Sequence, residues 1–242
     1  MDQAGRARTR YADAISIGET TATDACHHRA VSLPTTDDQV RPYGPNPSLA
    51  DRYHDRTERI RAAALELFAA RGYSLTTMDD IGERAGIRGP SVYKHVRSKQ
   101  HLLADIMLRT MDALLEAQQV ALGSSTDVQV RLRRVAEAHV RYHARHAAAA
   151  FIGSREINSL DEPYRTEVLD RRGTYERRIR HLIADGVDAG RFRVPSARLA
   201  SYAILDMGIG VAVWFRPDGE FSEDEVVYQY GEMALAIVGA RT

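Results

Sequence analysis

The sequence predicts an all-α protein, and three observations support this fold class. Apolar residues recur at three- and four-residue spacings, which place them on one face of a helix. No stretch shows the sustained apolar–polar alternation of half-buried strands. Turn-forming residues interrupt the helical patterns at Gly72, Gly86, Gly123 to Ser125, Asp161 to Pro163, Gly190 to Pro195 and Pro217 to Gly219.

Length and composition narrow the class of protein. The 242 residues are enough for one large domain or two small ones with a real core. Hydrophobic residues make up 44% and charged residues 27%, which is ordinary globular composition. No apolar run approaches the ~20 residues of a membrane span, and the first residues lack the apolar core of a signal peptide. A single cysteine, Cys26, allows no intramolecular disulfide, so we expect a cytoplasmic protein without a membrane partner.

The chain divides into three parts by composition. Residues 1–50 carry four of the eight prolines, many Thr and Asp residues and few apolar periods, and this composition predicts a mostly disordered arm. A mis-assigned translation start is an alternative explanation for this arm. Residues 51–101 contain several short helical patterns, and residues 102–242 contain longer ones.

The first helical patterns are bounded by clear start and stop signals. Ile60, Leu67 and Phe68 share one helical face, and Gly72 closes this helix. Thr77 caps a short second helix, which Gly86 ends. A short third helix has Pro90 near its first turn, and Ser98 caps a longer fourth helix. Further helices are predicted at about 127–145, 147–159, 163–189, 196–215 and 223–239.

The stretch from Thr77 to Val96 reads as helix, tight turn, helix. A small core is expected from Ile81, Ala85, Ile87, Val92 and Val96. The outward residues donate hydrogen bonds or carry positive charge, as a helix entering the DNA major groove should; they are Arg88, Ser91, Tyr93, Lys94 and His95. The whole chain has zero net charge, but residues 84–101 hold five cations and no acid, which suffices for a local DNA-binding patch. A purely structural helical hairpin is the alternative.

From Arg56 to Met107 the sequence resembles the TetR family of bacterial regulators. The matching residues are Phe68, Ala70 to Tyr73, Thr76, Thr77, Ile81, Ala85 to Ile87, Val92, Tyr93, His95, Val96, Ser98, Lys99, Leu102 and Leu103. The family usually has Phe where Val96 stands, a difference in the size of a core residue. The resemblance implies a three-helix DNA-binding domain with a helix-turn-helix, followed by a helical ligand-binding and dimerisation domain.

The resemblance also implies roles for individual residues. Thr77, Tyr93 and Lys99 would hold phosphates. Base edges would be approached by Arg88, Gly89, Pro90, Ser91 and Lys94. The partner would be a double-stranded, pseudo-palindromic operator, read by a homodimer whose last two helices pair with their copies. An ordinary intramolecular core is the alternative for these two helices, because periodicity does not separate core from interface.

The body offers a weaker set of candidate ligand-binding residues. Residues that could line a pocket between helices are Met107, Met111, Tyr142, Phe151, Tyr175, Met207 and Trp214. The segment Trp214 to Gly219 resembles a branch of actinobacterial TetR regulators, several of which sense acyl-CoA thioesters. Cations among Arg171, Arg172, Arg177, Arg178 and Arg180 could bind the CoA phosphates, although a solvated surface is the simpler explanation. His139, His143 and His146 share a helical face, but we predict no metal site and no cofactor.

These patterns lead to one main hypothesis and two alternatives. The main one is a repressor that a small apolar or acyl-CoA-like effector releases from its operator. A constitutive DNA-binding regulator without an effector is the second. An enzyme is not expected, because the sequence has no nucleophile elbow, phosphate loop, HExxH motif or paired cysteine ligands.

Overall fold

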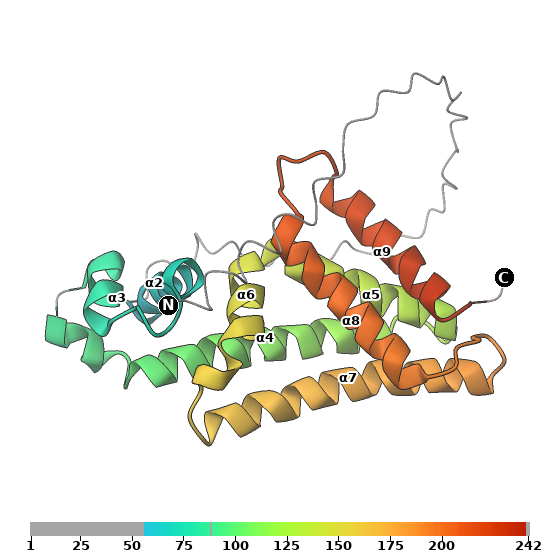
Figure 1. Ribbon diagram of the computed structural model, residues 1–242, viewed down its shortest axis with the longest axis horizontal. Helices are drawn as coiled ribbons and strands as arrows, with labels where there is room; N and C mark the ends of the chain where they lie inside the picture. Colours follow the sequence, from blue (N-terminus) through green and yellow to red (C-terminus); the bar gives the residue numbers. More distant parts are fainter. Residues whose placement is uncertain (1–55, 88, 241–242) are drawn as a thin grey trace, which may run out of the picture. The chain divides into compact units, whose positions relative to one another are not determined.

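The computed structural model describes residues 56–87 and 89–240, so the predicted arm at residues 1–50 lies outside it. All regular structure in these two ranges is helical, which confirms the all-α prediction (Figure 1). The α-helices are α2 (Arg56–Arg71), α3 (Met78–Ala85), α4 (Lys99–Leu122), α5 (Val128–Arg145), α6 (Ala147–Arg155), α7 (Tyr164–Asp188), α8 (Ala197–Trp214) and α9 (Glu223–Ile237). Two short 3-10 helices, η3 (Gly89–Lys94) and η4 (Ile157–Ser159), complete the set.

The local signals of the sequence place the first helices correctly. Gly72, with φ +86°, follows α2, and Gly86, with φ 68°, caps the C-terminus of α3. These left-handed conformations are open to glycine at little cost, and they turn the chain sharply after each helix. Ser98 caps α4 by accepting a hydrogen bond from the backbone N–H of His101.

The third helix differs from its expected form, because η3 is a 3-10 helix. Pro90 lies in the first turn, where its missing N–H would have no intrahelical partner in either helix type, so it does not select the 3-10 form. Val92 and Ser91 are weak α-helix formers, which disfavours the α-helical form. The expected core nevertheless forms: Ile81, Ala85, Ile87, Val92 and Val96 are all buried.

Helix α4 links the N-terminal helices to the body. It runs without a break across residues 101 and 102, where the boundary between the two predicted domains lies. In Figure 1, α2 and α3 lie at one end of α4, and α7 runs alongside it. Buried residues of α2, such as Phe68, belong to the same apolar core as Met107 of α4 and Ile183 of α7. The division of the described chain into two domains stays a prediction.

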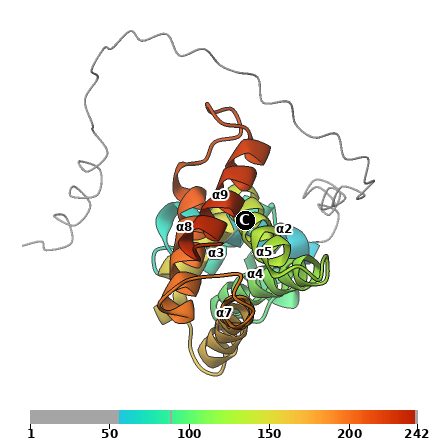
Figure 2. The ribbon, with the colours of Figure 1, turned by 90° about the vertical axis from the view of Figure 1, so that its right-hand side faces the viewer.

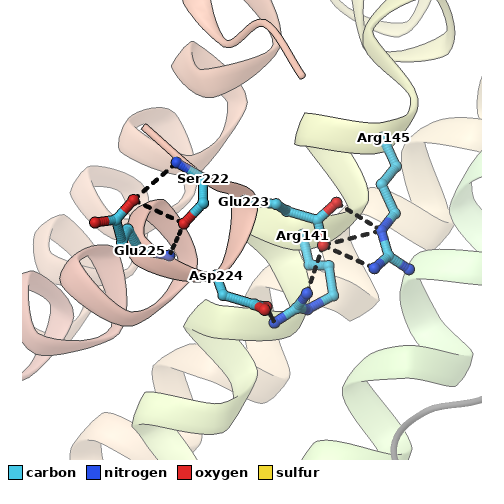
Figure 3. Close-up of polar contacts among 6 residues, drawn as sticks. All are labelled: Arg141, Arg145, Ser222, Glu223, Asp224 and Glu225. Atoms are coloured by element: carbon cyan, nitrogen blue, oxygen red, sulfur yellow. Dashed lines mark hydrogen bonds and ion pairs between the residues drawn. The ribbon is translucent and has the colours of Figure 1, made fainter. Parts of the chain in front are cut away.

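Helix α5 lies at the centre of the body and runs antiparallel to α9. Arg133 pairs with Glu232 in the middle of the two helices, while Arg141 and Arg145 bind Glu223 at the start of α9 (Figure 3). Burial favours a raised pKa for Glu223, but the hydrogen bonds and charges of Arg145 and Arg141 lower it. These ion pairs of Glu223 with Arg141 and Arg145 hold the first turn of α9 against the last turn of α5.

Helices α8 and α9 lie side by side at one side of the body (Figure 2). Large apolar side chains stand exposed on both; they include Leu199, Tyr202, Val213, Trp214 and Met233. By length and composition alone, α8 is the one helix of the described residues that could cross a membrane. This result qualifies the expectation that no apolar run would approach a span. A helix of a dimeric protein whose apolar face is covered by a second copy of the chain can have the same length and composition as a membrane-spanning helix.

Candidate DNA-binding surface and ligand cavity

Helix α3 begins at a capping box and packs closely against η3. The hydroxyl of Thr77 accepts a hydrogen bond from the N–H of Asp80 at 3.1 Å, and the carboxylate of Asp80 accepts one from the N–H of Thr77 at 2.8 Å. A Cβ atom on Gly82 would stand 2.9 Å from both the carbonyl oxygen of Ile87 and a methyl of Val92. Gly82 therefore permits a close approach between α3 and the segment that contains Ile87 and Val92.

The outer side of η3 carries several of the predicted base-contacting groups. Tyr93 is 57% exposed and Lys94 is exposed, whereas Ser91 and His95 are half-buried. Gly89 and Pro90 form the start of η3. Arg88 lies outside the described residues. The sequence predicted that these two side chains point outward. Because they are exposed, the phenol and the ammonium can reach a phosphate or a base edge.

Thr77 already has a partner at the position predicted to hold phosphate. Its hydroxyl donates to the carboxylate of Asp80 at 2.7 Å, and its N–H donates to the same carboxylate. Hydrogen bonds from Thr77 lower the pKa of Asp80, so the group there is an anion. A phosphate contact at Thr77 requires Asp80 to release one of these donors.

Lys99 makes contacts inside the N-terminal helices. Its ammonium donates to the carbonyl oxygens of Tyr73 at 3.0 Å and Thr76 at 2.8 Å, and it stands 4.3 Å from the centroid of the Tyr73 ring. These contacts tie the start of α4 to the loop between α2 and α3. The sequence predicted only a phosphate contact; the structure adds a structural role, with one ammonium hydrogen left.

A cavity of about 500 Å³ lies in the body, between α4, α5, α6, α7 and α8. Its buried wall includes Met107, Met111, Leu114, Val168 and Tyr175, while Ser154, Tyr202 and Asp206 are exposed and mark its rim. The interior is therefore mainly apolar, and several polar side chains lie at the rim. An apolar molecule with a polar end matches this division.

Two histidines of α5 form the polar part of the buried wall. His139 and His143 are 3% and 5% exposed, with ring centroids 4.5 Å apart. The nitrogens of His139 lie 3.1 Å from the hydroxyl of Tyr175 and 3.1 Å from the carbonyl oxygen of Leu205. Burial lowers the pKa of His139 to about 4 and, together with the neighbouring histidines, that of His143 to about 2. Both rings are neutral at physiological pH.

The same two histidines were missed as cavity residues by the sequence reasoning. The sequence does contain a pattern that predicts their burial. The two histidines continue the three- and four-residue spacing of the apolar residues Leu132, Val135 and Ala136, and all five residues are buried on one face of α5. His146 lies on the same helical turn but stacks on Tyr142. No group of three or more His, Cys, Asp or Glu side chains suited to a metal ion occurs within residues 56–87 and 89–240.

Arg172 of α7 supplies the cation of the cavity. Its guanidinium donates to the carbonyl oxygen of Gly153 on α6. Burial lowers its pKa, and no carboxylate of the described residues lies within 4.0 Å of it. Arg177, Arg178 and Arg180, which were predicted to meet CoA phosphates, do not line the cavity.

Only some of the seven residues predicted to bind ligand line this cavity. Met107, Met111 and Tyr175 do. The other four do not: Tyr142 stacks on His146, Phe151 stacks under Arg155, Met207 is half-buried outside the cavity, and Trp214 is 44% exposed beside Tyr230. Cavity residues that the sequence did not suggest include Thr110, Leu114, His139, His143, Glu176 and Ile209, whereas Arg172 belongs to the arginines suggested for an anionic ligand.

Comparison with known proteins places most of the described chain in one family. Residues 60–106 match the model for bacterial regulatory proteins of the tetR family, and residues 125–238 match the tetracyclin repressor-like C-terminal domain. The chain is 32% identical over 183 residues to the HTH-type transcriptional repressor KstR2 of Rhodococcus jostii (strain RHA1), covering 74% of this chain and 89% of that protein.

Solved structures agree with this placement. A bacterial regulatory protein in the tetR family from Rhodococcus RHA1 is 31% identical, with a TM-score of 0.72 over 78% of this chain and 99% of that chain. AibR in complex with isovaleryl coenzyme A and operator DNA shares the fold at 22% identity, with a TM-score of 0.68 over 77% of this chain and 100% of that one. The chain therefore belongs to the TetR family and is a DNA-binding transcriptional regulator with an N-terminal helix-turn-helix.

Proposed function

We propose that this protein is a repressor that binds a pseudo-palindromic operator as a homodimer and leaves it when a small, apolar, anionic effector enters the body. The observation that carries the proposal is the cavity of about 500 Å³, which adjoins α6, the helix whose far end contacts the loop after α2. The similar protein KstR2 is a transcriptional repressor by name, which supports repression rather than activation by this protein.

The surface of η3 supports sequence-specific DNA binding. Tyr93 and Lys94 are exposed on one short helix that follows a tight turn, so they can enter a groove together. Lys94 is assigned to base edges and Tyr93 to the phosphate backbone. A dimer then presents two such surfaces, and its two-fold symmetry requires two half-sites of opposite orientation.

The exposed faces of α8 and α9 support the homodimer. Leu199 and Val213 are each 68% exposed on α8, and Met233 is 46% exposed on α9. Adjacent apolar side chains on neighbouring helices are rarely left to water in a monomeric protein. Pairing α8 and α9 with their copies buries these side chains in a four-helix bundle.

A chain of contacts links the cavity to the DNA-binding helices. Ala150 and Gly153 of α6 line the cavity, and three residues after Gly153 the carboxylate of Glu156 accepts the N–H of Tyr73. Gln100 of α4 donates to the carbonyl oxygen of Ser159 at 2.6 Å. A ligand that displaces α6 therefore acts on both the α2–α3 loop and the first turn of α4.

The cavity chemistry supports an anionic effector with an apolar frame. Met107, Met111 and Leu114 offer apolar surface, and Arg172 offers a partly buried cation without a carboxylate partner within the described ranges. A buried cation is stabilised by an anionic ligand. Fatty or sterol-derived acids and their CoA esters combine these features, and the AibR complex holds isovaleryl coenzyme A.

The alternative is a constitutive regulator without an effector. A tightly packed body would favour it, whereas an apolar cavity with a partly buried cation that has no carboxylate partner within the described ranges favours a sensor. To move the protein from nearly all bound to nearly all free, the effector must prefer the released form by about 5 kcal/mol. Such a preference requires that most of the ligand be buried.

The test is a gel-shift titration on an operator selected from random duplexes with the purified protein. Long-chain and sterol-derived CoA esters are compared with the free acids and with free CoA. Release by an ester or acid, but not by CoA, is expected, and Arg172→Gln should weaken it while Arg178→Gln on the same helix should not. If no ligand changes operator affinity, the constitutive regulator is the better description.

A further inference from the structure

His143 is a buried polar side chain of the cavity that has no partner. Its ring lines the cavity and is 5% exposed, yet neither ring nitrogen has a hydrogen-bond partner among the described residues. A buried polar group left in this way is costly, and such groups are rare in folded proteins. The contrast with His139, whose two nitrogens are both partnered, shows that burial on this face does not itself prevent hydrogen bonding.

The packing around His143 leaves no protein group to supply the bond. The rings of His139 and Tyr142 meet it edge-on, with centroids 4.5 Å and 5.7 Å away, and the nitrogens of His139 are committed elsewhere. Helix α8 is pressed against His139 through Gly208, where a Cβ atom would stand 2.3 Å from the ring. The side of His143 that remains available is therefore the cavity.

We infer that the effector carries a neutral oxygen, a hydroxyl or a ketone, on its apolar frame, and that this oxygen hydrogen-bonds to the ring of His143. The inference rests on the proposed role of the cavity as the effector site. A neutral imidazole offers one N–H donor and one lone pair, so a hydroxyl can use either nitrogen and a ketone can accept from the N–H.

A charged group does not suit this position. The other titratable rings near His143 are those of His139, His146 and Tyr142, whose pKa is raised by burial, and the neighbouring positive charge of Arg145 acts on His146. Burial and the nearby histidines keep His143 neutral, so a carboxylate there would be desolvated without a cation bonded to it. The anion of the effector belongs at Arg172, and a plain hydrocarbon chain leaves His143 unsatisfied.

The experiment compares ligands that differ by one oxygen. Cholanic acid is paired with its hydroxylated counterpart lithocholic acid, and straight-chain fatty acids are paired with their ω-hydroxy counterparts, each as free acid and as CoA ester. Binding to the full-length protein is measured by calorimetry, and release from operator by gel shift. We expect the hydroxylated member of at least one pair to bind about tenfold more tightly.

A variant tests whether the ring of His143 causes the preference for the hydroxylated ligand. In His143→Phe the preference should disappear or reverse, whereas His181→Phe, at an exposed histidine of α7, should keep it. If His143→Phe does not fold, nitrogen-15 NMR of the histidine rings in the wild type replaces it. The ring-nitrogen signal of one buried histidine should then shift on addition of the hydroxylated ligand of a pair and not on addition of the unsubstituted one.

The remaining outcomes separate the inference from the proposed function. The inference is wrong if no hydroxylated member binds, if both members of every pair bind equally, or if the preference persists in His143→Phe. Binding of an unsubstituted acid with release from DNA would leave the proposed function standing without this inference. Oxygen-dependent binding without release would support the inference and contradict the proposed function.

Discussion

The carboxylate of Glu156 accepts a hydrogen bond from the backbone N–H of Tyr73 at 3.2 Å, across 83 positions of sequence. Glu156 directly follows α6, which lines the cavity, and Tyr73 begins the loop that leads to α3. The other carboxylate oxygen accepts from the hydroxyl of Ser159 at 2.7 Å, which holds the side chain in place. This contact is a direct mechanical connection between the cavity and the DNA-binding helices.

Removal of this connection should reduce the coupling between effector and DNA. In Glu156→Ala we expect operator binding to persist, but the ratio of operator affinities with and without effector should fall by about fivefold or more, within the usual range of coupling energies. Gel-shift titrations at saturating and zero effector measure this ratio. Glu220→Ala, at an exposed position before α9, is the control. An unchanged ratio in Glu156→Ala would contradict the connection.

Lys99 and Lys94 should have different effects on DNA binding. Lys99→Ala removes two hydrogen bonds to the carbonyl oxygens of Tyr73 and Thr76, so we expect a loss of stability of about 1–3 kcal/mol and equally weaker binding to all sequences. Lys94→Ala, at an exposed position, should leave stability unchanged and alter preference at particular base pairs. Urea unfolding and a panel of operator variants measure the two effects. Altered base preference in Lys99→Ala would argue against its structural role.

Stability should fall as the pH drops below the ordinary pKa of histidine. The unfolded chain binds protons near pH 6.5, whereas His139 and His143 stay neutral in the folded chain until about pH 4 and about pH 2. Protons therefore favour the unfolded state across this window, at roughly 2 kcal/mol per ring between pH 7 and pH 5. The free energy of unfolding of His143→Phe should therefore fall by roughly 2 kcal/mol less than that of the wild type between pH 7 and pH 5. His181→Phe should behave as the wild type. Equal losses in all three proteins would mean that His143 is protonated when folded.

A charge on the exposed face of α8 should break the dimer. Val213→Glu places a carboxylate where the side chain is 68% exposed in the single chain, and burial of an unpaired charge opposes pairing. Light scattering should then give the monomer mass of 27.0 kDa at micromolar concentration. Val120→Glu, at a residue of α4 that is 57% exposed, is the matched control and should remain dimeric. Tyr230 and Ile237 of α9 are less suitable sites for such a charge, because they are partly buried and also pack within the chain.

Much of the fold was predictable because helix ends depend on residues that are adjacent in sequence. The cap at Thr77, the glycines at 72 and 86 and the cap at Ser98 act within one turn of the helices they bound. The family match in the N-terminal helices is similarly local, so Tyr93 and Lys94 could be assigned to one exposed surface. The form of η3 was not predictable in the same way, since Pro90 is compatible with the first turn of either helix type.

The sequence by itself determined the helices, their order and the place of the DNA-reading segment, whereas the tertiary structure decided which side chains surround the cavity. Met207 and Trp214 have the right chemistry for a pocket, but the rotation of α8 about its axis turns them away and brings Leu205 and Ile209 to it. In the sequence, His143 is compatible with a surface residue or a metal ligand, and only the packing of α4, α6 and α8 around α5 buries its ring in the cavity wall. Helix rotation is set by the fit of many non-local side chains, and for that reason it is not encoded in any short stretch of the chain.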